Sequence, residues 1–191
     1  MADNRYRCEW CLKDQDYIDY HDNVWGKPEH DETKLFEFLN LEGAQAGLSW
    51  YTVLKKMDNY KKAFANWDVQ KIAKFSDKKK SKLLENRGII RNKLKVNAVV
   101  TNAQNYLKMR EEGLTLNDYL WNFVDGQTIN NKWEKMSQVP AQTPLSQQIS
   151  KNLRKRGFKF IGPTIVYAYM QAIGMVDDHL ISCISKSSFP K

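Results

Sequence analysis

Hydrophobic residues recur at helical spacing along most of the chain. Over residues 31–45 the apolar side chains return every three or four positions, and Asp31 is placed to cap the first turn. Over residues 49–64 the apolar residues repeat in the same way, while the lysines fall largely on the other side. The pattern predicts one helix in each range.

Helical spacing continues toward the C-terminus, and no stretch alternates apolar and polar residues as a half-buried strand would. Residues 126–144, rich in Gln, Asn, Thr and Pro, form the longest irregular segment and are predicted to be a surface connection. We therefore expect an all-α fold. The further helices are predicted at about 69–75, 77–86, 91–111, 115–122, 144–156, 163–174 and 177–183.

Length and charge narrow the class of protein. A chain of 191 residues that is 42% hydrophobic can build one substantial core or two small lobes with a shared interface, so we expect residues 1–191 to form a single unit. The formal charge of +8 favours a polyanionic partner, although charge alone does not separate nucleic acid from an acidic protein or a membrane surface.

The sequence contains no segment typical of a secreted or membrane protein. The N-terminus is polar where a secretory signal is apolar, and the apolar passage 160–176 is interrupted by Gly162 and Pro163 and is too short for a comfortable membrane span. We expect a cytoplasmic protein without a membrane partner, and a monomer by default.

A basic segment with two glycines, residues 154–164, joins a polar predicted helix to an apolar one. Gly157 can end the first helix, Gly162 permits a close approach, and Pro163 suits the first turn of the next helix. Such a helix-hairpin-helix directs backbone N–H groups and a positive helix end outward, which suits a DNA phosphate without reading sequence. The same pattern also fits an ordinary helix corner with a basic surface.

Cysteine and histidine residues cluster near both ends of the chain. His179 and Cys183 are four apart, so on the predicted helix 177–183 they would share one face. A closed structural zinc site needs two more ligands, and a metal shared by the two ends would pin them together. By spacing Cys8 and Cys11 are the most attractive pair, with His21 as a competitor. The candidates at the N-terminal end are Cys8, Cys11, His21 and His30.

Aromatic side chains and one carboxylate gather in two nearby stretches. Tyr17, Tyr20 and Trp25 lie in the first, and Glu42 and Trp50 lie in the second. Enzymes that flip a nucleotide stack its base between flat side chains, and a cationic base is stabilised further by electron-rich faces and a carboxylate. Glu42 lies on an otherwise apolar face, where a buried carboxylate needs a partner. The aromatic residues also fit an ordinary core, and Glu42 also fits an exposed position or a buried one where helix N-termini satisfy it.

Six short sequence motifs are more specific together than any one of them is alone. They are residues 7–10 (RCEW), 20–26 (YHDNVWG), 41–50 (LEGAQAGLSW), 88–91 (GIIR), 156–162 (RGFKFIG) and 178–179 (DH). Together they cover nearly the whole length, and the chain closely resembles the bacterial 3-methyladenine DNA glycosylase I family. The resemblance implies an all-helical member of the helix-hairpin-helix glycosylases that hydrolyses the N-glycosidic bond of 3-methyladenine in alkylated duplex DNA by base flipping.

The resemblance also implies roles for individual residues. Tyr20 and Trp50 would stack on the base, Glu42 would be the catalytic group that hydrogen-bonds the adenine edge, and Tyr17 and Trp25 would complete the walls. The zinc ligands would be Cys8, His21, His179 and Cys183, with His21 in place of Cys11. Gly47 and Leu48 would form the segment that lies beside the gap left in the DNA when the base flips out. The element that holds phosphate would include Gly157, Phe158, Lys159, Phe160 and Gly162.

One acidic position, Asp177, has no assigned role. Many members of the superfamily carry an essential aspartate at this position. In this sequence Asp177 fits an added electrostatic group, a helix cap or a residue without a role in the reaction.

Two further functional hypotheses stay open beside the glycosylase. No lysine is marked as a nucleophile, so strand cleavage through a Schiff base is not expected. The second hypothesis is a non-catalytic protein that binds distorted DNA and is held together by a structural zinc ion. The third is a related glycosylase that tolerates other alkylpurines or neutral bases.

Overall fold

Several helices begin at side-chain caps that the sequence supplies. In the computed structural model, which describes residues 6–186, helix α1 (Gln15–Asn23) begins where Asp14 accepts a hydrogen bond from the Tyr17 amide. Helix α2 (Glu32–Gln45) begins at Asp31, as predicted. Because each cap satisfies an amide that the helix itself leaves without a partner, these side chains fix where the helices begin.

The remaining elements follow in chain order and cover most of the described residues. The helices are α3 (Trp50–Leu54), α4 (Met57–Ala63), α5 (Val69–Ile72), α6 (Asp77–Glu85), α7 (Lys93–Glu111), α8 (Leu116–Trp121), α9 (Pro144–Lys155) and α10 (Pro163–Ala172). Two short strands, β1 (Ile129–Asn130) and β2 (Val176–Asp177), pair in parallel with Ile129 opposite Val176. The fold is therefore predominantly helical, in agreement with the predicted class.

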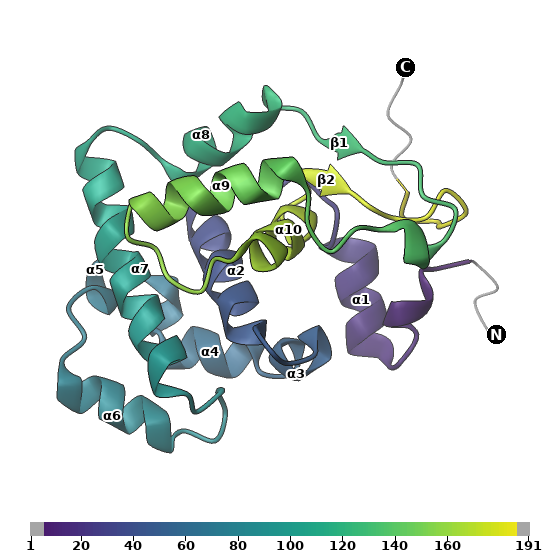
Figure 1. Cartoon of the computed structure of the whole chain (residues 1–191). Coiled ribbons are helices and arrows are strands. Elements are labelled where there is room, and N and C mark those ends of the chain that lie inside the picture. Colours follow the sequence, from purple (N-terminus) through teal and green to yellow (C-terminus); the bar gives the residue numbers. More distant parts are fainter. Residues whose placement is uncertain (1–5, 187–191) are drawn as a thin grey trace.

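Helix α2 lies at the centre of the molecule, with α7 on one side and α10 on the other (Figure 1). Every residue from 35 to 44 is buried, so this helix has no solvent face over that range. Its buried polar residues Glu37, Asn40 and Glu42 must each find a partner or lie at a cavity. The buried polar side chains of α2 are therefore candidates for a functional site inside the fold.

Most predicted helices are confirmed, and one is divided. The helices predicted at 31–45, 77–86, 91–111, 115–122, 144–156 and 163–174 are present within two residues at each end, and α5 is three residues shorter than predicted. The single helix predicted over 49–64 is wrong, because α3 and α4 are separated at Lys55 and Lys56. Both lysines are held by distant groups, Lys55 by Asp14 and Lys56 by the Arg87 carbonyl.

The C-terminal helix predicted at 177–183 is wrong. The backbone forms β2 there because the Ile129 amide bonds to the Met175 carbonyl and the Asn131 amide bonds to the Asp177 carbonyl, and turns follow. The Asp177 carboxylate also accepts a hydrogen bond from the His179 amide, which holds the chain in a turn. His179 and Cys183 therefore do not share a helical face, and the geometric argument made for them from sequence does not hold.

Two other segments differ from the sequence-based interpretation. Helix α1 was not predicted, and residues 126–144 contain β1 and a short 3₁₀ turn at Met136–Gln138 instead of only a surface connection. Among the described residues, none of the helices combines the length and the hydropathy that crossing a bilayer requires.

Candidate functional site

The five residues expected to bind a base line one cavity. Its volume is about 240 Å³, below the ~300 Å³ at which sites for drug-sized ligands begin. The walls come from the 3₁₀ turn at Glu9–Cys11, from α1, α2 and α3, and from the 3₁₀ turn at Met136–Gln138 and α10 in the C-terminal part of the chain. The lining residues are Trp10, Tyr17, Tyr20, Trp25, Glu42, Gln45, Trp50, Met136, Ala168 and Gln171.

Glu42 presents a carboxyl group without a protein partner to this cavity. The residue is 3% exposed, and within residues 6–186 its side chain makes neither a hydrogen bond nor an ion pair. Burial raises the pKa of Glu42 to about 8, because a low-dielectric surrounding disfavours the charged form. The group is therefore mostly protonated at neutral pH and ready to ionise beside a cation.

The aromatic walls surround Glu42 and add a second unsatisfied polar atom. The rings of Tyr20 and Trp50 lie with centroids 5.3 Å apart at an angle of 42°. The Trp50 indole N–H is buried and has no hydrogen-bond partner among the described residues. Trp10 packs edge-on against Tyr17 at 5.0 Å. A carboxyl group without a partner that lines an aromatic cavity, beside a wall residue whose N–H is also without one, is typical of a site that binds a polar, flat ligand.

Three of the four predicted metal ligands converge near the joined ends of the chain. The ligand atoms of Cys8, His21 and Cys183 all lie within 4.8 Å of one another, and all three residues are buried. A hydrogen bond from Cys8 lowers the pKa of Cys183. The fourth, His179, has its ring centroid 4.8 Å from that of His21. Its Nε2 is buried without a hydrogen-bond partner among the described residues.

Each histidine of this cluster has one ring nitrogen occupied by a carboxylate. His21 Nδ1 lies 2.7 Å from Asp22 Oδ1, and His179 Nδ1 lies 2.8 Å from Asp177 Oδ1. Carboxylates in this position orient histidines that bind metals through the other nitrogen. The arrangement leaves Nε2 of both rings for a metal, and it gives Asp177 a role that its sequence position did not reveal.

The two other metal-ligand candidates from the sequence point elsewhere. The Cys11 thiol donates to the Cys8 carbonyl at 3.1 Å and lies outside the cluster. His30 stacks near Trp121 and is hydrogen-bonded to Asn117. The donor set that fits a tetrahedral zinc site is therefore two sulfurs and two imidazoles.

The hairpin, residues 157–162 between α9 and α10, borders a second cavity of about 540 Å³, whereas Gly47 and Leu48 are not among the residues that line it. It is lined by Ala46, Arg154, Ile165 and residues 158–162, so the hairpin and the end of α2 face the same space. Leu48 is 39% exposed, as a contact residue must be. Phe158 is 2% exposed and packs in the core, so only its backbone is available to a partner.

Several residues of the site were not identified from sequence. The aromatic cavity is also lined by Gln45, Met136, Ala168 and Gln171. Trp10, another lining residue, belongs to the motif RCEW, but no role was assigned to it from sequence. The structural requirement at Gly26 was also missed. A Cβ there would lie 2.7 Å from His179 Cε1, and the residue has a φ of +74°. The place of this glycine at the end of the phrase YHDNVWG was the available signal.

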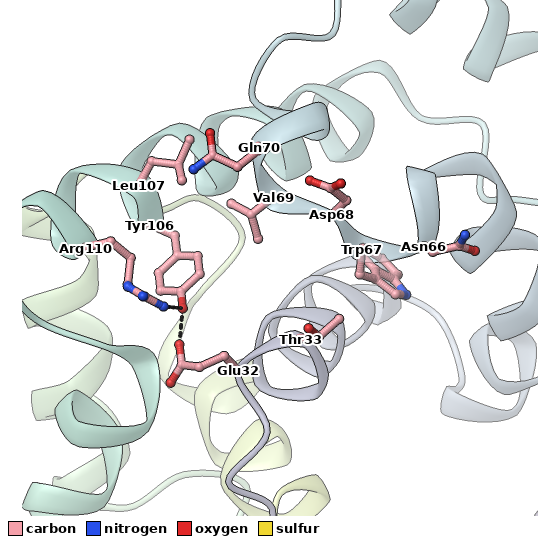
Figure 2. A pocket seen from close by; sticks show the side chains of 10 residues that line it. All are labelled: Glu32, Thr33, Asn66, Trp67, Asp68, Val69, Gln70, Tyr106, Leu107 and Arg110. Atoms are coloured by element: carbon pink, nitrogen blue, oxygen red, sulfur yellow. Dashed lines mark hydrogen bonds between the residues drawn. The ribbon is translucent and has the colours of Figure 1, made fainter.

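A larger cavity, of about 470 Å³, lies between α2, α5 and α7, and both of its carboxylates, Glu32 and Asp68, are already paired within the protein (Figure 2). Glu32 points toward Tyr106 and accepts a hydrogen bond from its hydroxyl, and Arg110 donates to the same hydroxyl. The Glu32 carboxylate also accepts the backbone amides of Leu116 and Asn117, so its hydrogen-bonding capacity is used by the protein. We therefore assign the functional site to the smaller aromatic cavity.

Comparison with known proteins agrees with this geometry. Residues 10–186 match the family described as methyladenine glycosylase. The chain belongs to the methyladenine glycosylase family. A DNA-3-methyladenine glycosylase of Haemophilus influenzae is 48% identical over 182 residues, which are 95% of this chain and 98% of that protein.

Solved structures of methyladenine glycosylases share the fold over nearly the whole chain. A crystal structure of 3-methyladenine DNA glycosylase I superposes with a TM-score of 0.92 at 47% identity, covering 94% of this chain and 98% of the other. A tyrosine-to-phenylalanine variant of such an enzyme in complex with 3-methyladenine has a TM-score of 0.92 at 35% identity, covering 96% and 99%. The family relationship therefore extends over every element that forms the aromatic cavity.

Proposed function

We propose that this protein is a DNA-3-methyladenine glycosylase that hydrolyses the N-glycosidic bond of 3-methyladenine in alkylated duplex DNA. The observation that carries the proposal is the buried carboxyl group of Glu42, which has no partner among the described residues and faces a cavity with aromatic walls. Such a cavity favours a flat, positively charged guest over a neutral one.

The chemistry follows from the charge of the lesion. Methylation at N3 makes the adenine cationic, so the base is a good leaving group and its departure needs less assistance than that of a neutral base. In our proposal, the flipped base stacks on the rings of Tyr20 and Trp50, and the ionised carboxylate of Glu42 stabilises it. The C–N bond to the sugar breaks, a water oxygen bonds to the sugar carbon, and the proton of that water passes to solvent while the base leaves neutral.

The remaining steps require no covalent intermediate. None of the residues that line the aromatic cavity is a lysine, so no amine is placed to attack the sugar there. We therefore propose a hydrolase without strand-cleaving activity. The hairpin at 157–162 would hold phosphate through its backbone, and Leu48 would lie at the gap that the flipped base leaves. We place the monomeric enzyme in the cytoplasm, where bacterial DNA is accessible.

We further propose that Cys8, His21, His179 and Cys183 hold a structural zinc ion. The buried His179 Nε2, which lacks a partner among the described residues, and the two carboxylates on Nδ1 support this assignment. When bound, the metal would contribute folding free energy by joining the two ends of the chain. Trp25 packs edge-on against His179 at 4.6 Å, so the same cluster supports one wall of the base cavity.

Product analysis tests the proposed reaction. The metal-replete protein is incubated with methylated duplex DNA, and the released bases are identified by chromatography and mass spectrometry. We expect free 3-methyladenine from the wild type and a loss of about 100-fold or more in Glu42→Gln. Glu37→Gln is the matched control, because Glu37 is equally buried on the same helix but paired with Lys34.

The possible outcomes separate the hypotheses. No released base from a wild type that binds the DNA would indicate a non-catalytic binder of distorted DNA. Release of several alkylpurines at similar rates would indicate a broader glycosylase. Unchanged release by Glu42→Gln would remove Glu42 from the mechanism.

Metal analysis tests the zinc proposal separately. We expect about one zinc ion per chain in the wild type and none in Cys183→Ser, with a lower melting temperature after chelation. Cys11→Ser is the control, because its thiol lies outside the cluster. Zinc content that is retained in Cys183→Ser and lost in Cys11→Ser would contradict the ligand assignment.

A further inference from the structure

One face of α7 contacts both segments that are expected to touch DNA. Lys95 and Asn102 are seven residues apart, two helical turns, and therefore lie on the same face of α7. The Lys95 ammonium donates to the carbonyls of Ala44 and Ala46 at 2.8 and 2.6 Å. These carbonyls belong to the end of α2, immediately before Gly47 and Leu48, so Lys95 fixes the backbone from which Leu48 projects.

Asn102 holds the hairpin in the same manner. Its amide oxygen accepts the Lys159 amide at 2.8 Å, and its amide nitrogen donates to the Lys159 carbonyl at 3.2 Å and to Asn40 Oδ1 at 2.9 Å. Asn102 is 2% exposed and Asn40 is 3% exposed. Both donors of the Asn102 amide are therefore used, and hydrogen bonds at this depth are costly to break.

The hairpin backbone requires such support because its conformation is strained. Phe160 has a φ of +54°, which is uncommon for a residue other than glycine. It packs directly on α2, since a Cβ on Gly43 would lie 3.2 Å from both the Cβ and the carbonyl oxygen of Phe160. Side chains of α7 thus hold the hairpin in a backbone conformation that is unfavourable for Phe160.

We propose that Lys95 and Asn102 are positioning residues that set the spacing between the Leu48 segment and the hairpin on duplex DNA. The inference rests on the proposed function. Because both segments must meet one DNA strand at the same time, an error in their relative position would weaken binding even if each segment were intact. No residue of α7 lines the aromatic cavity, so the base pocket does not depend on these contacts directly.

This separation gives the inference a specific signature. Loss of the Asn102 contacts changes how the protein binds DNA and leaves unchanged how it binds a free base. Asn102 carries no charge, so the effect cannot come from a lost ionic contact with phosphate. A general loss of structure would reduce both kinds of binding together.

The test compares two variants of Asn102 with a control on the same helix. Asn102→Ala removes all three hydrogen bonds, and Asn102→Ser is a milder alternative if the alanine variant does not fold. Lys95→Met tests the other end of the same face. The control is Gln104→Ala, whose side chain donates instead to the Ala73 carbonyl. The probes are a duplex with a tetrahydrofuran abasic analogue and free 3-methyladenine, and excision from methylated duplex is measured for KM and kcat.

We expect the Kd for the abasic duplex and the KM for excision to rise about tenfold in the Asn102 and Lys95 variants, equal to ~1.4 kcal/mol. The Kd for free 3-methyladenine should stay within about twofold, kcat should change less than KM, and Gln104→Ala should match the wild type. Unchanged DNA affinity in a folded Asn102 variant, or parallel losses of base and DNA binding, would overturn the inference. A wild type that releases no base would overturn the proposed function, while the abasic-duplex affinities would still decide the positioning role.

Discussion

Two buried carboxylates, Asp178 and Glu42, have opposite surroundings. Asp178 is fully buried, and its two oxygens accept hydrogen bonds from four side chains. Those donors are Asn131, Trp133, Tyr167 and Gln171, at distances between 2.6 and 2.8 Å. Glu42 is 3% exposed and accepts none from the described residues. Both acidic groups are removed from water, yet only one has its solvation replaced by the protein.

The difference distinguishes a structural group from a functional one. Four donors from separate regions make Asp178 a junction that holds residues 131–133, α10 and the C-terminal segment together. Glu42 is held in a site that destabilises its charged form, and only a ligand can supply the missing partner. The fold therefore tolerates an unfavourable group at the position where a cationic base is expected to bind.

The largest effect on stability is expected at Asp178. Asp178→Asn replaces one acceptor oxygen by an N–H₂ group that faces existing donors, leaving buried groups without partners. We expect a loss of about 3 kcal/mol or more in the free energy of unfolding, measured by urea denaturation. A loss below about 1 kcal/mol would show that the junction is less important than its geometry indicates.

Glu42→Gln should change stability in the opposite direction. The folded pKa near 8 exceeds the unfolded value, so the folded carboxyl keeps its proton while the unfolded one releases it. Rising pH between about 4.5 and 8 therefore destabilises the wild type through this group. Glutamine has no such penalty, and we expect the variant to be more stable at pH 7 by on the order of 1–3 kcal/mol.

The pH dependence of that difference is its control. Unfolding curves of both proteins should coincide near pH 4 and diverge up to about pH 8, beyond which the gap stays constant. Glu37→Gln, which breaks the pair with Lys34, should show no such gain. Equal stability of wild type and Glu42→Gln at pH 8 would contradict the burial penalty.

The catalytic efficiency should also follow the ionisation of Glu42. With a pKa of about 8, roughly 10% of the free enzyme carries the carboxylate at pH 7 and roughly 90% at pH 9. Because a cationic lesion binds the carboxylate form, kcat/KM should rise about ninefold over that range. Rates on methylated duplex DNA at constant ionic strength measure this, and a profile already flat from about pH 6 upward would be inconsistent with it.

The smallest effect is expected at Gln171, which contacts both environments. Its amide donates to Asp178 at 2.8 Å, and its side chain also lines the aromatic cavity. Gln171→Ala should lower the free energy of unfolding by about 1 kcal/mol and reduce excision only a few-fold. Calorimetry and excision assays on the same preparation would show whether the two environments are coupled. If Gln171→Ala lost as much excision activity as Glu42→Gln, the surroundings of Asp178 and the aromatic cavity would be coupled.

The sequence predicted those parts of the fold whose information is local. Helix α2 carries its own cap and a long periodic apolar pattern, so its bounds were predicted almost correctly. The break between α3 and α4 was not, because both halves keep the same apolar periodicity and the lysines at the break are held by groups far away in sequence. The strand at Val176–Asp177 depends on pairing with β1, which no pattern in residues 177–183 reveals.

The site residues were predicted mainly from sequence motifs shared with a known family and less from residue spacing and chemistry alone. The aromatic residues and Glu42 were singled out as a dense aromatic group with one carboxylate, the family resemblance then implied their individual roles, and the structure brings those five residues to one cavity. The roles of Asp177 and Asp178 depend on partners that only the tertiary structure supplies. Met136 was missed for the same reason, since it reaches the cavity from a segment predicted to lie on the surface.

A site-specific titration of Glu42 is the most direct measurement. Protein with ¹³C-labelled glutamate carboxyl groups is titrated by NMR with and without 3-methyladenine, and Glu42→Gln identifies the signal. We predict a midpoint near pH 8 in the free protein and a clear displacement of that signal when the base binds. A midpoint near 4.5 that does not respond to the base would contradict the assignment of Glu42 as the group that receives the lesion.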